Sequence, residues 1–202
     1  MSWNAERAKA RIKEHQKSIP AVEDNIALDA HFRELAKAKR EGLMDRLPTR
    51  QAFLVEGVHL YGCLLDFDAM MVKDGRETEE SHSRLLAFLN MHYRVWDGIV
   101  DGESSDRVDY HGARMHAVIT SPAGDPVAQL KRAIALAKKL EEAAKQVGSA
   151  HGFPSRIRFG IDHGKCLAMT TGRSLEKDTL FLGRPANHAA KLAADGDGRG
   201  SF

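Results

Sequence analysis

The chain has 202 residues and a formal net charge of +2, and its 43% hydrophobic and 29% charged residues are ordinary for a globular protein. This length is sufficient for one medium-sized domain with an extension and a sizeable core. The near-neutral charge argues against a nucleic-acid partner. No apolar stretch reaches the length of a membrane span, so no membrane partner is expected.

The start of the chain and its cysteines predict a cytoplasmic protein. The first residues, MSWNAERAKARIKEHQKS, lack the apolar stretch of a signal peptide. Cys63 and Cys166 both stand in apolar runs, which is typical of reduced thiols in a core rather than of a disulfide.

Residues 1–48 are predicted to form a helical arm in front of a second domain at 49–202. Residues 4–18 are polar and helix-prone, and residues 22–42 carry a partial apolar stripe. Leu47-Pro48-Thr49 is typical of a linker. The arm is either a solvated extension or an element for dimerisation or signal transduction, and the sequence leaves both open.

Strands and helices alternate through residues 49–202 in a pattern typical of an α+β fold. We expect helices at 81–96, 126–147 (ended by Gly148) and 183–193, and loops at 73–80, 97–106 and 170–178. We expect single strands at 58–67 and 179–182. Two strand pairs are expected, one at 107–119 that turns at His111-Gly112 and one at 156–169 that turns at Asp162-His163-Gly164. Residues 195–202 are expected to be a mobile end. Paired strands outnumber single crossovers, which predicts an antiparallel or mixed sheet with helices on one face.

The first strand ends in two acids, Asp66 and Asp68, where the chain turns into Ala69-Met70-Met71. Carboxylate oxygens are the ligands that hard divalent cations prefer, so this turn is a candidate metal site. The alternative is that one aspartate caps the following turn and the other is solvated.

The last helix presents Asn187 and Lys191 four residues apart, so both point from one face. His111, His116, His163 and His188 lie in the other polar motifs, but their spacing does not make a zinc site. Asn187 and Lys191 are therefore the candidate polar groups of this second region.

Three segments, in this order and spacing, resemble the class III nucleotide cyclase catalytic domain. They are LLDFDAM after a strand, YHGARMHAVI, and RIRFGIDHGKCLAM followed by LFLGRPANHAAKLA. The last is the most specific, because a GI-x-x-G element, a strand, a glycine, an asparagine and a basic residue follow one another as in the family. The resemblance covers about residues 57–195 and implies the ferredoxin-like α+β sheet of these cyclases.

The resemblance implies that the 3′-hydroxyl of a nucleoside triphosphate attacks its own α-phosphate, helped by two divalent ions, Mn²⁺ or Mg²⁺, held by two aspartates. The first aspartate matches Asp66, or Asp68 in the alternative register. Phe67, which lies between them, is expected to contact the substrate. The second falls on Ala113, so either Asp68 or Asp109 helps to hold metal or one metal site is weak. The family assembles its sites between two protomers, which implies a homodimer.

Asn187 matches the residue that orients the ribose, and Lys191 replaces the arginine that stabilises the transition state. Lysine is a point charge rather than a planar fork, so slower chemistry is expected. A phosphate-binding lysine of the family has no match, and Lys165, Arg173, Lys177 and Arg184 are the candidates to supply this charge.

The two base-reading positions fall on Asp109 and Leu180, and neither purine pair is present. Asp109 is an acceptor suited to N3–H of uracil or to the exocyclic amine of cytosine, and His111 is a further candidate substrate contact. The chain thus resembles the pyrimidine cyclases of Pycsar antiphage systems, which signal to a separate effector. We expect UTP to be converted to cyclic UMP; cyclic CMP, a purine product, and a weakly catalytic nucleotide-binding regulatory domain remain the alternatives.

Overall fold

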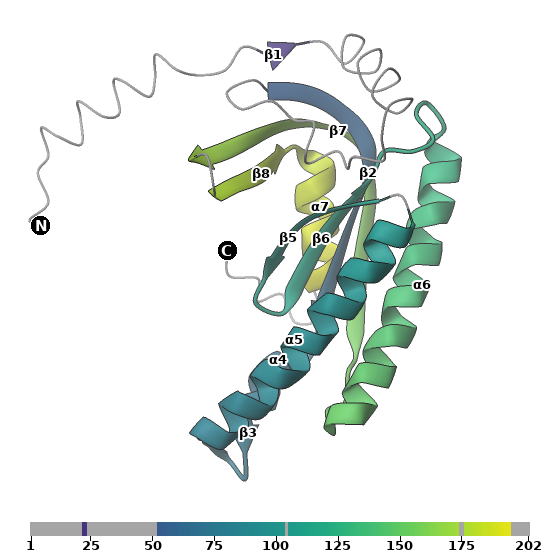
Figure 1. Cartoon of the computed structure of the whole chain (residues 1–202). Helices are drawn as coiled ribbons and strands as arrows, with labels where there is room; N and C mark the ends of the chain where they lie inside the picture. Colours follow the sequence, from purple (N-terminus) through teal and green to yellow (C-terminus); the bar gives the residue numbers. More distant parts are fainter. Residues whose placement is uncertain (1–21, 24–51, 104, 174–175, 195–202) are drawn as a thin grey trace, which may run out of the picture.

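The computed structural model describes residues 22–23, 52–103, 105–173 and 176–194, which form a six-stranded sheet with helices packed against it and a separate two-stranded hairpin (Figure 1). Most of the predicted arm, the predicted linker and the C-terminal residues 195–202 lie outside the described residues. Val22–Glu23 form strand β1, which pairs in parallel with the start of β2. The helix predicted at 22–42 is therefore wrong at its first two residues.

Strand β2 (Ala52–Leu64) is the centre of a six-stranded sheet with the order β5-β6-β2-β7-β8, and β1 pairs with β2 outside this order. Its neighbours are β6 (Arg114–Ile119) and β7 (Ile157–Arg173), both antiparallel to it. β5 (Asp106–His111) and β8 (Glu176–Leu182) complete the order, so the hairpin predicted at 107–119 and the strand predicted at 179–182 are confirmed. β2 starts six residues before the predicted strand because Phe53 and Val55 also enter a buried cluster, and it ends at Leu64, three residues before the predicted end.

The strand pair predicted at 156–169 is one continuous strand, β7, and so the predicted turn at Asp162-His163-Gly164 is wrong. β7 pairs with β2 without interruption from Ile157 to Ala168 and then continues into the region predicted as a loop. Gly160 and Gly164 lie on the same face of β7, where helix α7 (Arg184–Ala194) packs closely. These glycines permit close packing rather than a turn.

Helix α5 (Glu79–Gly102) is longer at both ends than the predicted 81–96 helix and includes most of the predicted 97–106 loop. Thr78 caps its start, and its hydroxyl accepts a hydrogen bond from the Ser81 amide. Val100 is fully buried one turn after Trp96, so burial continues the helix past Gly98.

Helix α6 (Pro126–His151) continues past Gly148, where the sequence predicted its end. A Cβ at Gly148 would lie 2.6 Å from the Phe153 carbonyl oxygen, so the glycine allows the returning chain to pack against the helix. Gly152, with φ of 69°, ends the helix instead, because glycine adopts left-handed backbone angles without a Cβ penalty.

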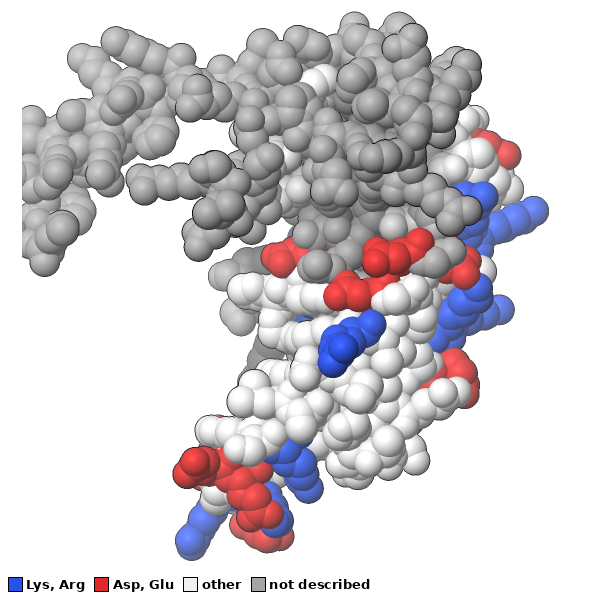
Figure 2. All heavy atoms as spheres, viewed as in Figure 1, with Lys and Arg blue, Asp and Glu red and all other residues white. Residues whose placement is uncertain are grey.

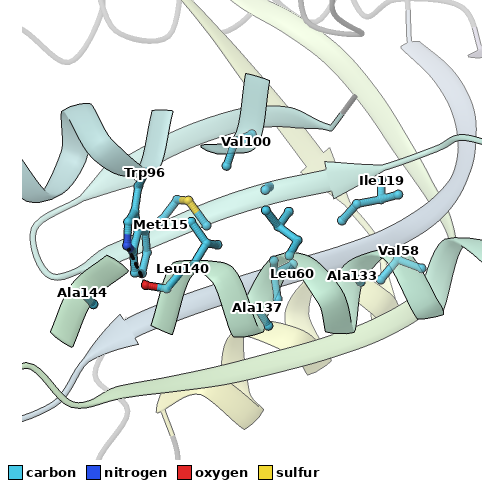
Figure 3. Packing of buried hydrophobic residues seen from close by; sticks show 12 residues of the cluster. Val58, Leu60, Trp96, Val100, Met115, Ile119, Ala133, Ala137, Leu140 and Ala144 are labelled. Carbon is cyan, nitrogen blue, oxygen red and sulfur yellow. Dashed lines mark hydrogen bonds between the residues drawn. The ribbon is translucent and has the colours of Figure 1, made fainter. Parts of the chain in front are cut away.

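The main core lies between the sheet and the two long helices (Figure 3). Val58 and Leu60 of β2 meet Leu140 of α6 and Trp96 of α5, and all four are buried. The Trp96 indole N–H donates to the Leu140 carbonyl oxygen at 3.1 Å, which joins the two helices in the interior. This core fixes the sheet on which the candidate site is built.

The opposite face of the sheet is covered by α7, so the prediction that the helices lie on one face of the sheet is wrong. Ala186 of α7 joins a second buried cluster with Phe53, Val55 and Phe181. The predicted α+β fold and the predicted last helix are confirmed, with the long helices α5 and α6 together on one face. None of the helices in the described ranges is long and apolar enough to cross a membrane.

Three small elements connect β2 to α5: helix α4 (Phe67–Met70) and the hairpin strands β3 (Val72–Lys73) and β4 (Arg76–Glu77). The hairpin replaces part of the loop predicted at 73–80. Figure 2 shows charged side chains of both signs gathered at this tip and along the side formed by α6, with a broad uncharged surface between them. The two signs are interspersed on the described part of this face, and the absence of a nucleic-acid partner stays a prediction.

Candidate active site

The exit of β2 holds Asp66 and Asp68 in a tight turn. Asp66 has φ of 59°, and although it stands at the start of α4 its side chain makes no capping hydrogen bond. Asp68 is exposed in the first turn of α4, and Phe67 between them is half-buried against the cluster that contains Leu64 and Met70. The capping alternative therefore does not hold for Asp66, and its carboxylate is available for other partners.

Two backbone hydrogen bonds fix the surroundings of this turn. The Leu64 amide donates to the Ala113 carbonyl oxygen at 2.9 Å, and the Leu65 amide donates to the Arg156 carbonyl oxygen at 2.8 Å. Ala113 thus lies beside the strand exit, where the resemblance places a second carboxylate, but it has none to offer.

The Asp66 carboxylate is engaged by Arg156, a residue that the sequence did not single out. Arg156 Nε donates to Asp66 Oδ2 at 3.1 Å, and an Nη of the same guanidinium contacts the same oxygen. Arg156 lies 90 residues away in sequence, just before β7, and no local spacing links it to Asp66. Only the pairing of β2 with β7 brings the two together.

The β5–β6 hairpin carries Asp109 and His111, and two tyrosines anchor it to α5. The Tyr93 hydroxyl of α5 donates to the Gly112 carbonyl oxygen at the turn, and Tyr110 stacks on Tyr93 with ring centroids 4.3 Å apart. The Tyr110 hydroxyl donates to the Tyr93 carbonyl oxygen at 3.1 Å. Asp109 and His111 are left exposed, so the hairpin is held while its acid stays accessible to a ligand.

A layer of aromatic rings lies beside Asp109 on the α7 side of the sheet. Asp109 pairs in register with His116, and the His116 ring stacks on Tyr61 with centroids 4.1 Å apart. Burial raises the pKa of Tyr61 to about 12, with further contributions from Cys166 and Asp109. Nδ1 of His59 and Nε2 of His116 share a 3.0 Å hydrogen bond beneath this layer. The Tyr61 hydroxyl stays protonated at neutral pH and can donate beside Asp109.

Three buried histidines make the fold sensitive to acid. Burial lowers the pKa of His59 and of His92 to about 4, and burial followed by the charge of His59 holds the pKa of His116 well below its ordinary value. His92 Nδ1 finds no partner among the described residues. The unfolded chain takes up these protons near pH 6.5 whereas the folded chain resists them, so stability is full above pH 6.5 and is lost as the pH falls toward 4.

His92→Phe should therefore reduce the acid sensitivity of the fold. At pH 5 each histidine with a pKa of about 4 costs about 2 kcal/mol of unfolding free energy relative to pH 7. Urea unfolding at pH 7 and pH 5 measures this difference, which should shrink by about 2 kcal/mol in the variant. His82→Gln, at an exposed site on the same helix, is the control. If the unfolding free energy fell equally from pH 7 to pH 5 in His92→Phe and in the wild type, His92 would not be a source of the acid sensitivity.

Helix α7 presents Asn187 and Lys191 to solvent from one face, as predicted. Its buried face packs on β7, with Pro185 over Gly164 and the Ala189 backbone over Gly160. The His188 Nδ1 contacts Asp162 Oδ2 of β7 at 2.9 Å, which adds a polar tie.

The position of α7 relative to Asp66 follows from this packing. Arg158 of β7 donates to the Ala194 carbonyl oxygen at 3.3 Å and pairs in register with Cys63, three residues before Asp66. The C-terminal end of α7 thus lies at the Asp66 end of the sheet, whereas Asn187 lies farther along it.

Leu180 lies on β8 with 43% of its surface exposed. β5 and β8 stand at opposite ends of the strand order but contact each other, because the sheet curls. The strands that carry Asp109 and Leu180 therefore approach one another. Of the candidate phosphate-binding cations, Lys165 and Arg184 are accessible to solvent at least in part, and the side chains of Arg173 and Lys177 lie outside the described residues.

The turn at Asp66 fits one divalent ion better than two. Asp66 and Asp68 offer two exposed carboxylates and the Phe67 carbonyl lies between them, but Ala113 adds no ligand. Within the described ranges no group of three or more histidine, cysteine, aspartate or glutamate side chains could hold a metal. An ion at this turn would need further oxygens from a bound ligand, such as phosphate.

A family model for the adenylate and guanylate cyclase catalytic domain matches residues 69–200. The chain therefore belongs to this family. The match includes the β5–β6 hairpin, β7, β8 and α7, and it begins three residues after Asp66.

Two curated relatives bear the name uridylate cyclase. One, from a Rhizobium species, is 40% identical over 218 residues, and the other, from Pseudomonas aeruginosa, is 34% identical over 207 residues. Each alignment covers 100% of this chain but only 42% and 38% of the relatives. The chain thus spans about two fifths of the length of the curated relatives it matches.

Solved structures support the fold. A crystal structure of a class III adenylyl cyclase-like ATP-binding protein from Pseudomonas aeruginosa has a TM-score of 0.79 and 32% identity, covering 98% of this chain and 41% of that one. The catalytic core of a rhodopsin-guanylyl cyclase in complex with ATPαS has a TM-score of 0.59 and 22% identity, covering 71% of this chain and 74% of that one. The second likeness concerns the fold alone.

Proposed function

We propose that this chain is the catalytic domain of a uridylate cyclase, which converts UTP to 3′,5′-cyclic UMP and pyrophosphate. The observation that carries the proposal is that two relatives named uridylate cyclase align with all 202 residues. Support comes from the acids at the β2 exit and from the exposed Asn187 and Lys191 on α7.

In the proposed reaction the 3′-oxygen of UTP forms a bond to the α-phosphorus, and the bond from that phosphorus to the bridging oxygen of pyrophosphate breaks. The 3′-hydroxyl proton passes to solvent. Asp66 and Asp68 are the residues that would hold a divalent ion, Mn²⁺ or Mg²⁺, which when bound neutralises phosphate charge and lowers the pKa of the hydroxyl. Asn187 orients the ribose, and Lys191 places a positive charge at the α-phosphate.

Asp109 is proposed to select the base by accepting a hydrogen bond from N3–H of uracil. It is exposed on the anchored β5–β6 hairpin, and the protonated Tyr61 hydroxyl lies in the same layer. Leu180 offers no hydrogen bond, and Phe67 and His111 complete the proposed substrate contacts. Cytosine, which presents an exocyclic amine to an acceptor, is the alternative pyrimidine.

The proposed assembly is a head-to-tail homodimer in which each site uses acids of one protomer and α7 of the other. The location of Asn187 along the sheet, away from the end that holds Asp66, supports this arrangement. The cytoplasmic location, the antiphage role and the separate effector that reads cyclic UMP are part of the same proposal. The location rests on the two cysteines in apolar runs, and the other two follow from the family resemblance alone.

A second candidate function is a nucleotide-binding regulatory domain with little turnover. Ala113 at the second acidic position and Lys191 in place of an arginine favour it, as does the structural relative described as an ATP-binding protein. Tight binding of a nucleoside triphosphate without cyclic product would identify this function.

Incubation of the chain with ATP, GTP, UTP and CTP separately, each with Mn²⁺, tests the proposal. Mass spectrometry should detect cyclic UMP from UTP at a rate well above those with the purine nucleotides. Product from ATP or GTP alone would contradict the pyrimidine assignment, and calorimetric binding without any product would favour the regulatory domain.

A further inference from the structure

The carboxylate proposed to hold metal already has a cation beside it. Two nitrogens of the Arg156 guanidinium contact Asp66 Oδ2, one of them at 3.1 Å and both on the same oxygen. A metal ligand that is also an ion-pair partner must divide its charge between two cations.

The position of Arg156 is set by the fold rather than by a flexible side chain alone. Its carbonyl oxygen accepts the Leu65 amide hydrogen at 2.8 Å, one residue before Asp66, and Phe153 three residues earlier is buried. The backbone of Arg156 is thus tied to the strand exit. The Asp66 side chain makes no capping hydrogen bond to α4. Its carboxylate instead forms the ion pair with Arg156.

The charges at this turn predict that Arg156 and a metal ion would compete for the Asp66 carboxylate. Within the described part of the strand exit, Asp66 and Asp68 supply the negative charge, and the neighbouring Ala113 adds none. Arg156 already offsets one of these two charges. A divalent ion bound to Asp66 would lie next to the Arg156 guanidinium, and the two positive charges would repel each other.

We propose that Arg156 is a resident cation of this site that opposes divalent-metal binding at Asp66 and supplies part of the positive charge that a second ion would bring. This inference rests on the proposed nucleotide site. In this proposal Arg156 acts on the site through the charge of Asp66.

Mn²⁺ binding to the free chain, followed by electron paramagnetic resonance, tests this without turnover. Arg156→Gln should bind Mn²⁺ about three- to fivefold more tightly than the wild type, which is the upper part of what an exposed ion pair is worth. Arg156→Lys keeps the charge and should bind within about twofold of the wild type. Arg132→Gln removes one charge from α6, away from the site, and should also leave Mn²⁺ affinity unchanged.

Equal or weaker Mn²⁺ binding by Arg156→Gln would overturn the inference, because Arg156 would then orient Asp66 for the metal. Absence of Mn²⁺ binding in both the wild type and Arg156→Gln would also overturn it. These outcomes are independent of the cyclase proposal: a chain without cyclic product can still show the Mn²⁺ difference, and an active cyclase can lack it.

Discussion

Asp66→Asn should lower cyclic UMP formation about 100-fold or more, because the amide cannot supply the anionic oxygen that the proposed metal requires. Asparagine is the informative substitution. Asp66 has φ of 59°, and asparagine tolerates this left-handed backbone whereas alanine is strained there. Loss of activity in Asp66→Asn would thus come from the loss of the carboxylate rather than from backbone strain. The rates are measured at saturating UTP and Mn²⁺.

Asp74→Asn is the matched control for this substitution. Asp74 also has a positive φ, of 53°, and lies exposed in the turn of the β3–β4 hairpin. The same chemical change there should leave the rate within about twofold of the wild type. If Asp66→Asn kept more than about a tenth of the wild-type rate, the metal would have to be held elsewhere.

Gly160→Ala should destabilise the fold by several kcal/mol, the largest stability effect that we expect. A Cβ at Gly160 would lie 1.9 Å from the Ala189 carbonyl oxygen and 2.6 Å from the Ala193 amide nitrogen. Both are backbone atoms of α7, so relief requires the whole helix to move. Because α7 carries Asn187 and Lys191, cyclic UMP formation should fall with stability.

Urea unfolding measures the Gly160→Ala effect, and Gly98→Ala is its control. Gly98 lies inside α5, and no neighbouring side chain or strand of the described residues comes within 4 Å of the position that an alanine methyl would take. Alanine there should therefore stabilise the helix by about 0.5–1 kcal/mol. Hydrogen exchange should show lost protection in α7 for Gly160→Ala only. An unfolding free energy within about 0.5 kcal/mol of the wild type would show that α7 does not pack on β7 in this way.

The glycines of β7 show where prediction from the sequence failed. Gly160-Ile161-Asp162-His163-Gly164 has the composition of a turn, which is why a turn is predicted there. The glycines are spaced by four on one face of a strand, and the helix above them presents small residues, Ala186, Ala189 and Ala193. Which of the two interpretations holds depends on the partner helix, and its location is a tertiary property.

The predicted helix ends are wrong for a related reason. Asp97-Gly98 and Gly148 have the local composition of helix ends, but tertiary burial of Val100 and the close packing of Phe153 keep both segments helical. The hairpin at His111-Gly112 was predictable because Gly112, with φ of 56°, is required by the turn itself.

Some residues of the candidate site could likewise be predicted from the sequence, and others could not. Asp66, Asn187 and Lys191 are visible in the sequence as residues at the ends or on the faces of recognisable elements. Arg156 is not, because its role comes from the register between β2 and β7. The tyrosine anchors of the hairpin were missed as well, because nothing in the local sequence links Tyr93 to the turn at Gly112.

The most direct test of the uridylate cyclase account is a competition among all four nucleoside triphosphates. The chain is incubated with an equimolar mixture of ATP, GTP, UTP and CTP and Mn²⁺, and the cyclic monophosphates are quantified together by mass spectrometry. The account predicts that cyclic UMP is the main product. A mixture dominated by cyclic AMP, cyclic GMP or cyclic CMP, or one with no cyclic product, would contradict it.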